Sequence, residues 1–145
     1  MALTVRDATF AELDTATLYA LLRLRAEVFV VEQACPFNDL DGRDTEPGAR
    51  HVWLEADDGT IAGYVRLLDE PDGAVKISRV VSAAAARGSG IGDRVMAEAL
   101  ARVGARPVVL DAQTRLLAWY ERLGFERAGP DFLEDDILHT PMRRP

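Results

Sequence analysis

A chain of 145 residues with 48% hydrophobic and 28% charged residues predicts one soluble globular domain, spanning residues 1–145, with a core of its own. Its formal net charge of −7 argues against nucleic acid as the main partner, because a polyanion is repelled by an acidic surface. We expect a cytoplasmic protein without a membrane span, since no signal peptide or long apolar run is visible and Cys35 is the single cysteine.

The first third of the chain predicts a strand, a helix and a long loop. Residues 3–8 are typical of a short strand. Apolar residues at helical spacing predict a helix over 16–30, with Asp14 or Thr15 as its N-cap. Residues 33–50 are rich in turn formers and acids, and a loop of that length in a compact domain is more often functional than incidental.

The rest of the chain alternates strands and helices. Two apolar runs around Asp58-Gly59 predict a β-hairpin, and a third strand makes an antiparallel meander with them. The apolar run at 107–112 is typical of a buried parallel strand, and Gly124 is expected to end the last helix. The expected strands are 51–56, 61–68, 74–82, 107–112, 125–128 and 139–143, and the expected helices are 89–103 and 116–123.

Three alternate glycines, Gly88, Gly90 and Gly92, lie between a strand and a helix. The free N–H groups and the dipole at the start of a helix suit a phosphate, and glycine lets the backbone approach it closely. The dinucleotide pattern G-x-G-x-x-G fails because Asp93 stands at its third glycine, and the Gly-Lys-Ser/Thr sequence of nucleoside-triphosphate loops is missing. What remains is R-x-x-G-x-G, residues 87–92.

This stretch resembles the acyl-coenzyme A pyrophosphate loop of the GNAT acetyltransferase superfamily. Residues 120–125 match its Y-x-x-x-G-F pattern, seven residues after Gln113, where the family often has asparagine. Residues 22–44, His51 and the closing residues 134–142 resemble the ElaA-type branch, whose substrate is poorly defined. The resemblance implies a mixed α/β (α+β) fold: a mostly antiparallel sheet of six to seven strands, helices on both faces, and one parallel βαβ crossover that carries the pyrophosphate loop.

The resemblance also implies an activity: acetyl-CoA-dependent transfer of an acetyl group to a primary amine of a small molecule or protein, by direct attack. Tyr120 maps to the general acid that protonates the leaving thiolate. The backbone N–H groups of residues 80–82 would bind the pantetheine and the thioester carbonyl, and a splay between this strand and 107–112 would admit the pantetheine arm. The implied cofactor-binding residues are Val80, Val81, Ser82, Arg87, Gly88, Ser89, Gly90, Ile91, Gly92, Asp93, Gln113 and Tyr120.

The general base stays open. Glu32 is the first candidate, because it follows an apolar run and is expected to be partly buried with a raised pKa. Asp39, Asp41 and Glu134 are further candidates, and each also reads as a turn residue or as an attraction for a cationic amine.

The remaining polar residues have structural interpretations. His51 and His139 are each expected in a strand, where a structural role is more common, and they are too far apart to form a metal motif. Arg25, Arg66 and Arg79 lie among apolar residues and are candidate buried ion-pair partners for the acids. Cys35 is interpreted as an incidental thiol.

Two alternatives to the enzyme remain open at this point. A non-catalytic acyl-CoA-binding sensor would use the same loop. An acyl-homoserine-lactone-synthase-like enzyme would share the R-x-x-x-F pattern of residues 25–29, although the two GNAT patterns count against it. A homodimer is compatible with the resemblance, and neither nucleic acid, a membrane nor a metal is expected as a partner.

Overall fold

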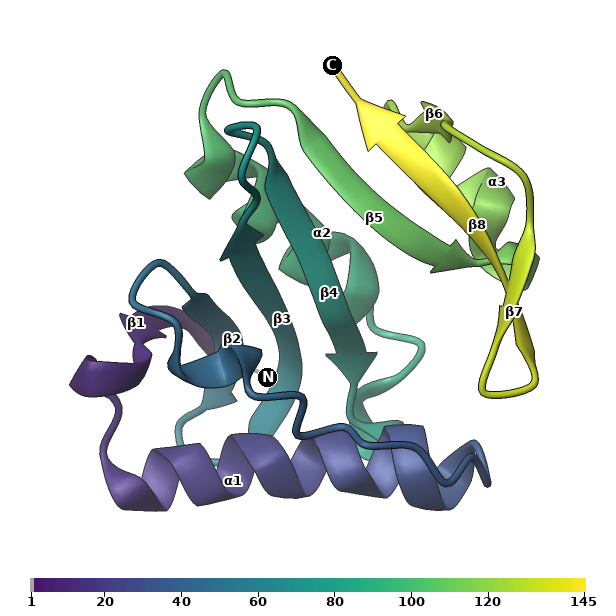
Figure 1. The fold of residues 1–145 in the computed structure, drawn as a ribbon. Coiled ribbons are helices and arrows are strands. Elements are labelled where there is room, and N and C mark those ends of the chain that lie inside the picture. The colour runs from purple at the N-terminus through teal and green to yellow at the C-terminus, as the bar shows by residue number, and fades with distance from the viewer. Residues whose placement is uncertain (1) are drawn as a thin grey trace.

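An eight-stranded, mostly antiparallel sheet organises residues 2–145, which the computed structural model describes (Figure 1). Its order is β1-β2-β3-β4-β5-β8-β6, and β7 pairs with β8. The strands are β1 (Leu3–Thr9), β2 (Arg50–Ala56), β3 (Ile61–Asp69), β4 (Val75–Ser82), β5 (Val108–Gln113), β6 (Glu126–Arg127), β7 (Phe132–Glu134) and β8 (Ile137–Arg144). Since only β4 and β5 are parallel, the predicted fold class is confirmed, with β7 as a strand that the sequence did not predict.

The helix α1 (Thr15–Arg25) begins where the sequence predicts. The Thr17 N–H donates to the Asp14 carboxylate at 2.7 Å, which caps the first turn. Beyond Arg25 the chain continues as a π-helical segment, Ala26–Glu32, so it passes the expected end at residue 30. This wider turn changes which side chains face the sheet, and Val31 is 74% exposed.

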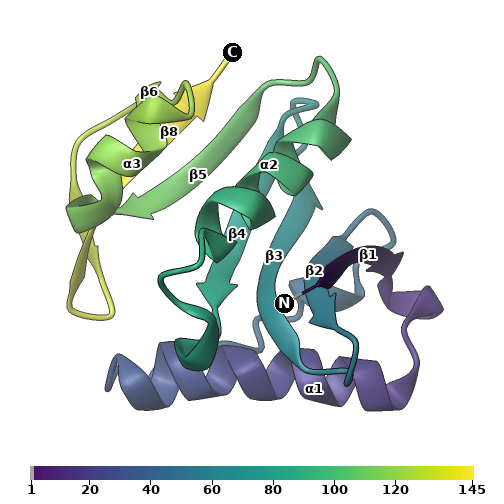
Figure 2. The same cartoon turned by 180° about the vertical axis from the view of Figure 1, so that it is seen from behind.

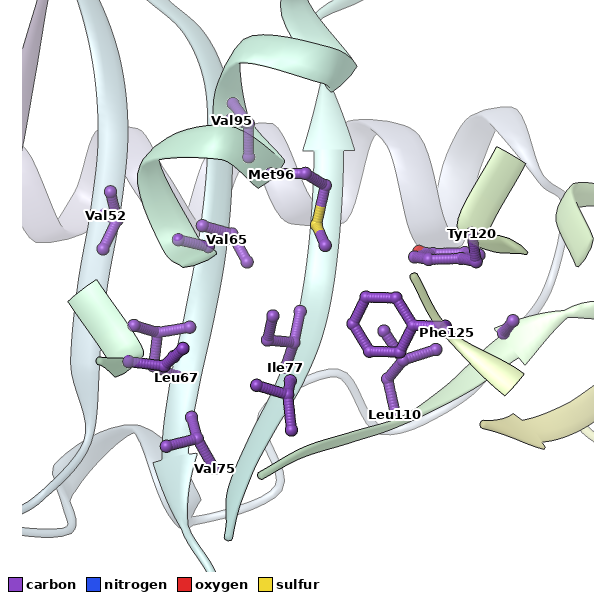
Figure 3. Packing of buried hydrophobic residues seen from close by; sticks show 14 of the residues in the cluster. Val52, Val65, Leu67, Val75, Ile77, Val95, Met96, Leu110, Tyr120 and Phe125 are labelled. Carbon is purple, nitrogen blue, oxygen red and sulfur yellow. The ribbon is translucent and has the colours of Figure 1, made fainter. Parts of the chain in front are cut away.

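Helices cover both faces of the sheet, as expected (Figure 2). On one face, Leu21, Leu24 and Val28 pack against a cluster that includes Trp53 and Tyr64 of β2 and β3. On the other face lie α2 (Ile91–Val103) and α3 (Leu117–Arg122). Figure 3 shows that core, whose members include Val65, Ile77, Met96, Leu110, Tyr120 and Phe125. None of the helices within residues 2–145 has the length and apolar character that a membrane span requires.

The strands β4 and β5 pair only at their first residues. Val75 pairs with Val108 and Lys76 with Val109, and within residues 2–145 no further β4–β5 pair follows. In contrast, β5 pairs with β8 along its whole length, from Val108 to Gln113. The rest of β4 therefore diverges from β5 (Figure 1), as the expected splay requires.

A bulge distorts β4 beside this opening. The register with β3 shifts between the pairs Tyr64–Val81 and Arg66–Ser78, and Arg79 has a φ of +57°, which is uncommon for a residue with a side chain. Such bulges re-aim side chains and interrupt pairing next to binding sites.

Candidate active site

A cleft of about 1060 Å³ lies at the opening between β4 and β5. A hollow of about 220 Å³ adjoins it at the start of α2, and both are lined by Ser82, Arg87, Gly92 and Trp119. The β7–β8 turn borders the cleft and meets the segment after α1, where the Cys35 thiol donates to the Asp135 carbonyl at 3.1 Å. Cys35 is buried, and this backbone contact is compatible with the expectation that its thiol has no chemical role.

The implied cofactor residues gather around these two spaces. Those that line the cleft are Val80, Val81, Ser82, Arg87, Gly92, Gln113 and Tyr120. Those that line the hollow are Ser82, Arg87, Gly88, Gly90, Ile91, Gly92 and Asp93, and Ser89 is exposed on the same loop.

The glycine loop has the backbone that an anion site needs. Gly88 and Gly90 have φ values of +87° and +74°, and a Cβ on either would meet open space, so conformation rather than crowding requires glycine there. Gly90 is the N-cap of α2 and offers no side-chain acceptor to the first N–H groups of the helix. The Trp119 indole N–H donates to the Asp93 carboxylate at 2.6 Å and links α3 to this first turn. The positive-φ glycines and the uncapped N–H groups at the start of α2 suit a phosphate.

Arg87 is held by Glu32. Two guanidinium nitrogens donate to the two carboxylate oxygens, Nη2 to Oε1 at 2.6 Å, and Nη2 also donates to the Ser82 carbonyl at 3.2 Å. The prediction that Glu32 is partly buried with a raised pKa is therefore wrong. The Glu32 side chain is 43% exposed, and the hydrogen bonds from Arg87 lower its pKa. A carboxylate held in this way is a weak proton acceptor.

Tyr120 is buried and faces the cleft. Its ring packs edge-on against Trp119, with centroids 4.8 Å apart, and against Phe125 at 5.9 Å. Burial raises the pKa of the phenol to about 12, so the group holds its proton at neutral pH. Tyr120 can therefore donate a hydrogen bond or a proton to an atom in the cleft.

Three buried or half-buried arginines tie the 33–50 loop to α1 and to the sheet. The ion pairs are Arg25 with Asp39 and Asp44, Arg66 with Asp41 and Asp44, and Arg79 with Asp39 and Asp41. The expected arginine–acid pairing is confirmed, and Asp44 is a central member that the sequence did not single out. Because its arginine partners hold the pKa of the Asp41 carboxyl far below its usual range, Asp41 does not fit a general base.

The two histidines differ in their surroundings. Both ring nitrogens of His51 are engaged, Nδ1 with the Tyr64 hydroxyl at 2.6 Å and Nε2 with the Asp44 carbonyl at 3.0 Å, so the expected structural role fits. His139 lies in β8 as expected and lines the cleft. Within residues 2–145 no three His, Cys, Asp or Glu side chains gather closely enough to hold a metal ion.

Trp119 is the main site residue that the sequence did not indicate. It lines both the cleft and the hollow and joins α3 to α2 through Asp93. These partners are 26 residues apart in the chain, so no local pattern could reveal their contact.

Comparison with known proteins gives consistent relatives. A sequence model of the GNAT acetyltransferase domain matches residues 15–144. The UPF0039 protein Rv2851c of Mycobacterium tuberculosis is 49% identical, over 92% of this chain and 88% of that protein. Protein ElaA of Escherichia coli is 38% identical, over 96% of this chain and 94% of its own, and its crystal structure has a TM-score of 0.92. An acyl-CoA N-acyltransferase structure from Pseudomonas aeruginosa has a TM-score of 0.94 at 45% identity, covering 99% of this chain and 100% of that one.

Proposed function

The chain belongs to the GNAT acetyltransferase family, in its ElaA-like branch, and from this premise we propose that it transfers an acetyl group from acetyl-CoA to a primary amine of a small molecule or a protein. One observation carries the proposal: the glycine loop at the start of α2 and the Tyr120 phenol line adjoining spaces at the opening between β4 and β5. A location in the cytoplasm and a homodimer remain predictions from the sequence.

The pyrophosphate of coenzyme A is assigned to residues 87–92. The open space above Gly88 and Gly90 leaves room for phosphate oxygens against the backbone, and the α2 N-terminus supplies a partial positive charge. Arg87 adds a guanidinium whose planar donors match phosphate oxygens. For Arg87 to bind there, its two-point pair with Glu32 has to open.

The thioester is assigned to the edge of β4 beside the bulge. From Ile77 to Ser82 this strand pairs with β3 and has no β5 partner among residues 2–145, so N–H groups of residues 80–82 that point into the opening are free to donate. Donors fixed in a sheltered cleft stabilise the negative charge that develops on the carbonyl oxygen in the transition state.

Tyr120 is assigned as the general acid. As the amine nitrogen bonds to the carbonyl carbon and the C–S bond breaks, the phenol gives its proton to the leaving sulfur. A phenol with a pKa of about 12 is a weaker acid than a thiol, so the transfer depends on the poor solvation of a thiolate in the cleft.

The first test is binding. Acetyl-CoA at roughly 100 times its Kd should stabilise the native state by about 2.7 kcal/mol, which corresponds to a rise in Tm of roughly 5–10 °C. NAD should give no rise. Gly90→Val should abolish the rise, because a β-branched residue does not tolerate a φ of +74° and its side chain would occupy the phosphate position.

The second test is turnover, measured as CoA release with a panel of primary amines. Tyr120→Phe should keep the rise in Tm and slow CoA release roughly 100-fold. Binding of acetyl-CoA with no CoA release for any amine would indicate a non-catalytic sensor, and a lactone product would indicate a synthase of acyl-homoserine lactones. No rise in Tm at millimolar acetyl-CoA would overturn the proposal as a whole.

A further inference from the structure

We propose that His139 is the general base of the acyl transfer and that it accepts the amine proton on the face of the sheet opposite to Tyr120. The inference rests on the proposed function, which supplies the thioester and the amine. It replaces Glu32, the base expected from the sequence, because the Glu32 side chain is 43% exposed beside Arg87, the residue assigned to the pyrophosphate.

The hydrogen bonding of His139 fixes which ring nitrogen is free. Its Nδ1 lies 2.7 Å from the carbonyl oxygen of Ile137, and a carbonyl only accepts, so Nδ1 carries the hydrogen and Nε2 presents a lone pair. The ring also stacks on Phe132, the residue opposite it in β7, with centroids 5.7 Å apart and planes 21° apart. Within residues 2–145 no protein group hydrogen-bonds to Nε2.

The strand register places His139 and Tyr120 on different sides. Residues opposite each other in antiparallel strands share a face, so His139 lies on the same face as its partner Gln113. The alternate pair, Ala112 with Thr140, faces the other side, where Ala112 belongs to the core that includes Tyr120. Since both His139 and Tyr120 line the cleft, it offers a base from one side and an acid from the other.

A contact toward α1 supports this orientation. The Gln113 side-chain amide donates to the Gln33 side chain, which directly follows the π-helical segment, at 3.4 Å. The face of β5 and β8 that carries His139 is therefore the face covered by the α1 segment. Phe29 of that segment also lines the cleft, as does Phe37 of the loop after it, which leaves the acceptor a partly apolar wall.

The carboxylates of the cleft are less suited to this role. They are Glu32, Asp41, Asp111, Glu134 and Asp135. Glu32 is 43% exposed beside Arg87, Asp41 is paired with two arginines, and Asp111 lies 3.5 Å from the Lys76 ammonium. Glu134 and Asp135 are exposed to solvent at the β7–β8 turn. An imidazole with one nitrogen fixed and the other free is the better-prepared acceptor.

The proton balance of the step is complete. The lone pair of the neutral amine attacks the thioester carbonyl carbon and forms the C–N bond, and the proton released from nitrogen goes to His139 Nε2. The C–S bond breaks with its electron pair on sulfur, which takes the Tyr120 proton. Solvent then carries a proton from the His139 imidazolium to the Tyr120 phenolate, so both groups return to their starting state.

Chemical modification tests the free nitrogen without any need for turnover. The chain has two histidines, and diethyl pyrocarbonate should modify His139 while His51, with both nitrogens engaged, stays unmodified in the native protein. Peptide mass spectrometry reads both sites. Modification of His51 in preference to His139 would overturn the assignment.

Kinetics test the base with a matched pair of variants. His139→Asn keeps an N–H group near the position of Nδ1 and removes Nε2, so it should lower kcat for CoA release roughly 100-fold and leave the Tm rise with acetyl-CoA intact. Leu138→Ala is the control, because this side chain is 45% exposed on the neighbouring position of β8 and faces the other way.

Chemical rescue separates a base from a structural role. In His139→Ala, free imidazole should restore part of the lost rate with the fastest amine of the panel, and it should not accelerate the wild type. A His139→Asn variant with wild-type kcat would overturn the assignment and leave the proposed function standing. If the wild-type protein binds acetyl-CoA but releases no CoA, either with the amines of the panel or by hydrolysis, both the assignment of His139 and the proposed function would be overturned.

Discussion

Glu32→Gln is predicted to tighten the binding of acetyl-CoA. In the free protein the Glu32 carboxylate occupies Nη1 and Nη2 of Arg87, the donors that a pyrophosphate would use. The ligand therefore competes with an internal anion, and the displaced carboxylate remains near the incoming phosphates as a like charge. Both effects weaken the binding of acetyl-CoA in the wild type, so removing the Glu32 charge should strengthen it.

The expected size of the effect follows from exposure. The Arg87 and Glu32 side chains are 42% and 43% exposed, and water screens a pair of that kind strongly. We therefore expect the Kd of acetyl-CoA to fall by a factor of roughly two to five, in the range typical of exposed pairs. The gain should shrink as salt rises from 50 to 500 mM, because salt screens the same interaction (Debye length about 14 to 4 Å).

Isothermal titration calorimetry measures this change directly. The control is Glu27→Gln, which alters the net charge of −7 by the same amount but removes an exposed pair with Arg23 on α1. That variant should bind acetyl-CoA like the wild type, and Arg87→Ala should bind it more weakly. Weaker binding by Glu32→Gln would refute the reasoning, because it would mean that Glu32 prepares Arg87 for the ligand instead of competing with it.

Three further predictions concern the framework of the site. Asp44→Asn should lower the unfolding free energy by about 3 kcal/mol and Tm by roughly 6–12 °C in a thermal melt. The substitution removes the negative charge that pairs with two buried arginines, Arg25 and Arg66. Asp57→Asn, on the surface, is the control and should change little. Gly63→Ala should cost about 1–3 kcal/mol in urea unfolding, because a Cβ there would lie 2.7 Å from two side chains of α2. Acid should destabilise the wild type more than Asp44→Asn. Arginine neighbours lower the pKa of Asp44 in the folded state, so its contribution is present above the ordinary aspartate pKa of 3.8 and is lost as pH falls below it toward the folded-state pKa. Urea midpoints at pH 7 and pH 3.5 that fall equally in both proteins would contradict the last prediction.

The regular elements could be predicted because their signals are local. Alternating apolar residues, the Asp58-Gly59 turn and the helical periodicity before Val103 each act within a few residues, and the structure has strands and helices at those places. The strand β7 was not predicted, since its three residues are too few to show the alternation of apolar and polar residues that indicates a strand. The π-helical turn was also missed, because it depends on how the end of α1 packs and not on a sequence signal.

The surroundings of the charged site residues could not be predicted, because they depend on side-chain pairs between distant parts of the chain. The apolar run before Glu32 suggested burial, but Val31 is 74% exposed and Glu32 pairs with Arg87, 55 residues later in the chain. Asp44 shows the same limit, as it meets Arg66 from a strand 22 residues away. The glycine loop does lie at the start of a helix, as predicted, because glycine at positive φ and a helix start are backbone properties, which local sequence does encode.

The acidic loop after α1 carries less charge into the cleft than its composition suggests. Asp39, Asp41 and Asp44 face three arginines, so this network is neutral as a unit even though the chain has a net charge of −7. Its main effect is mechanical, because charges that are buried and fully paired hold the loop against β3 and β4. On the proposed function, the loop forms a wall of no net charge beside the acceptor, so we expect the shape of the apolar surface and access to His139, rather than positive charge, to select the amine.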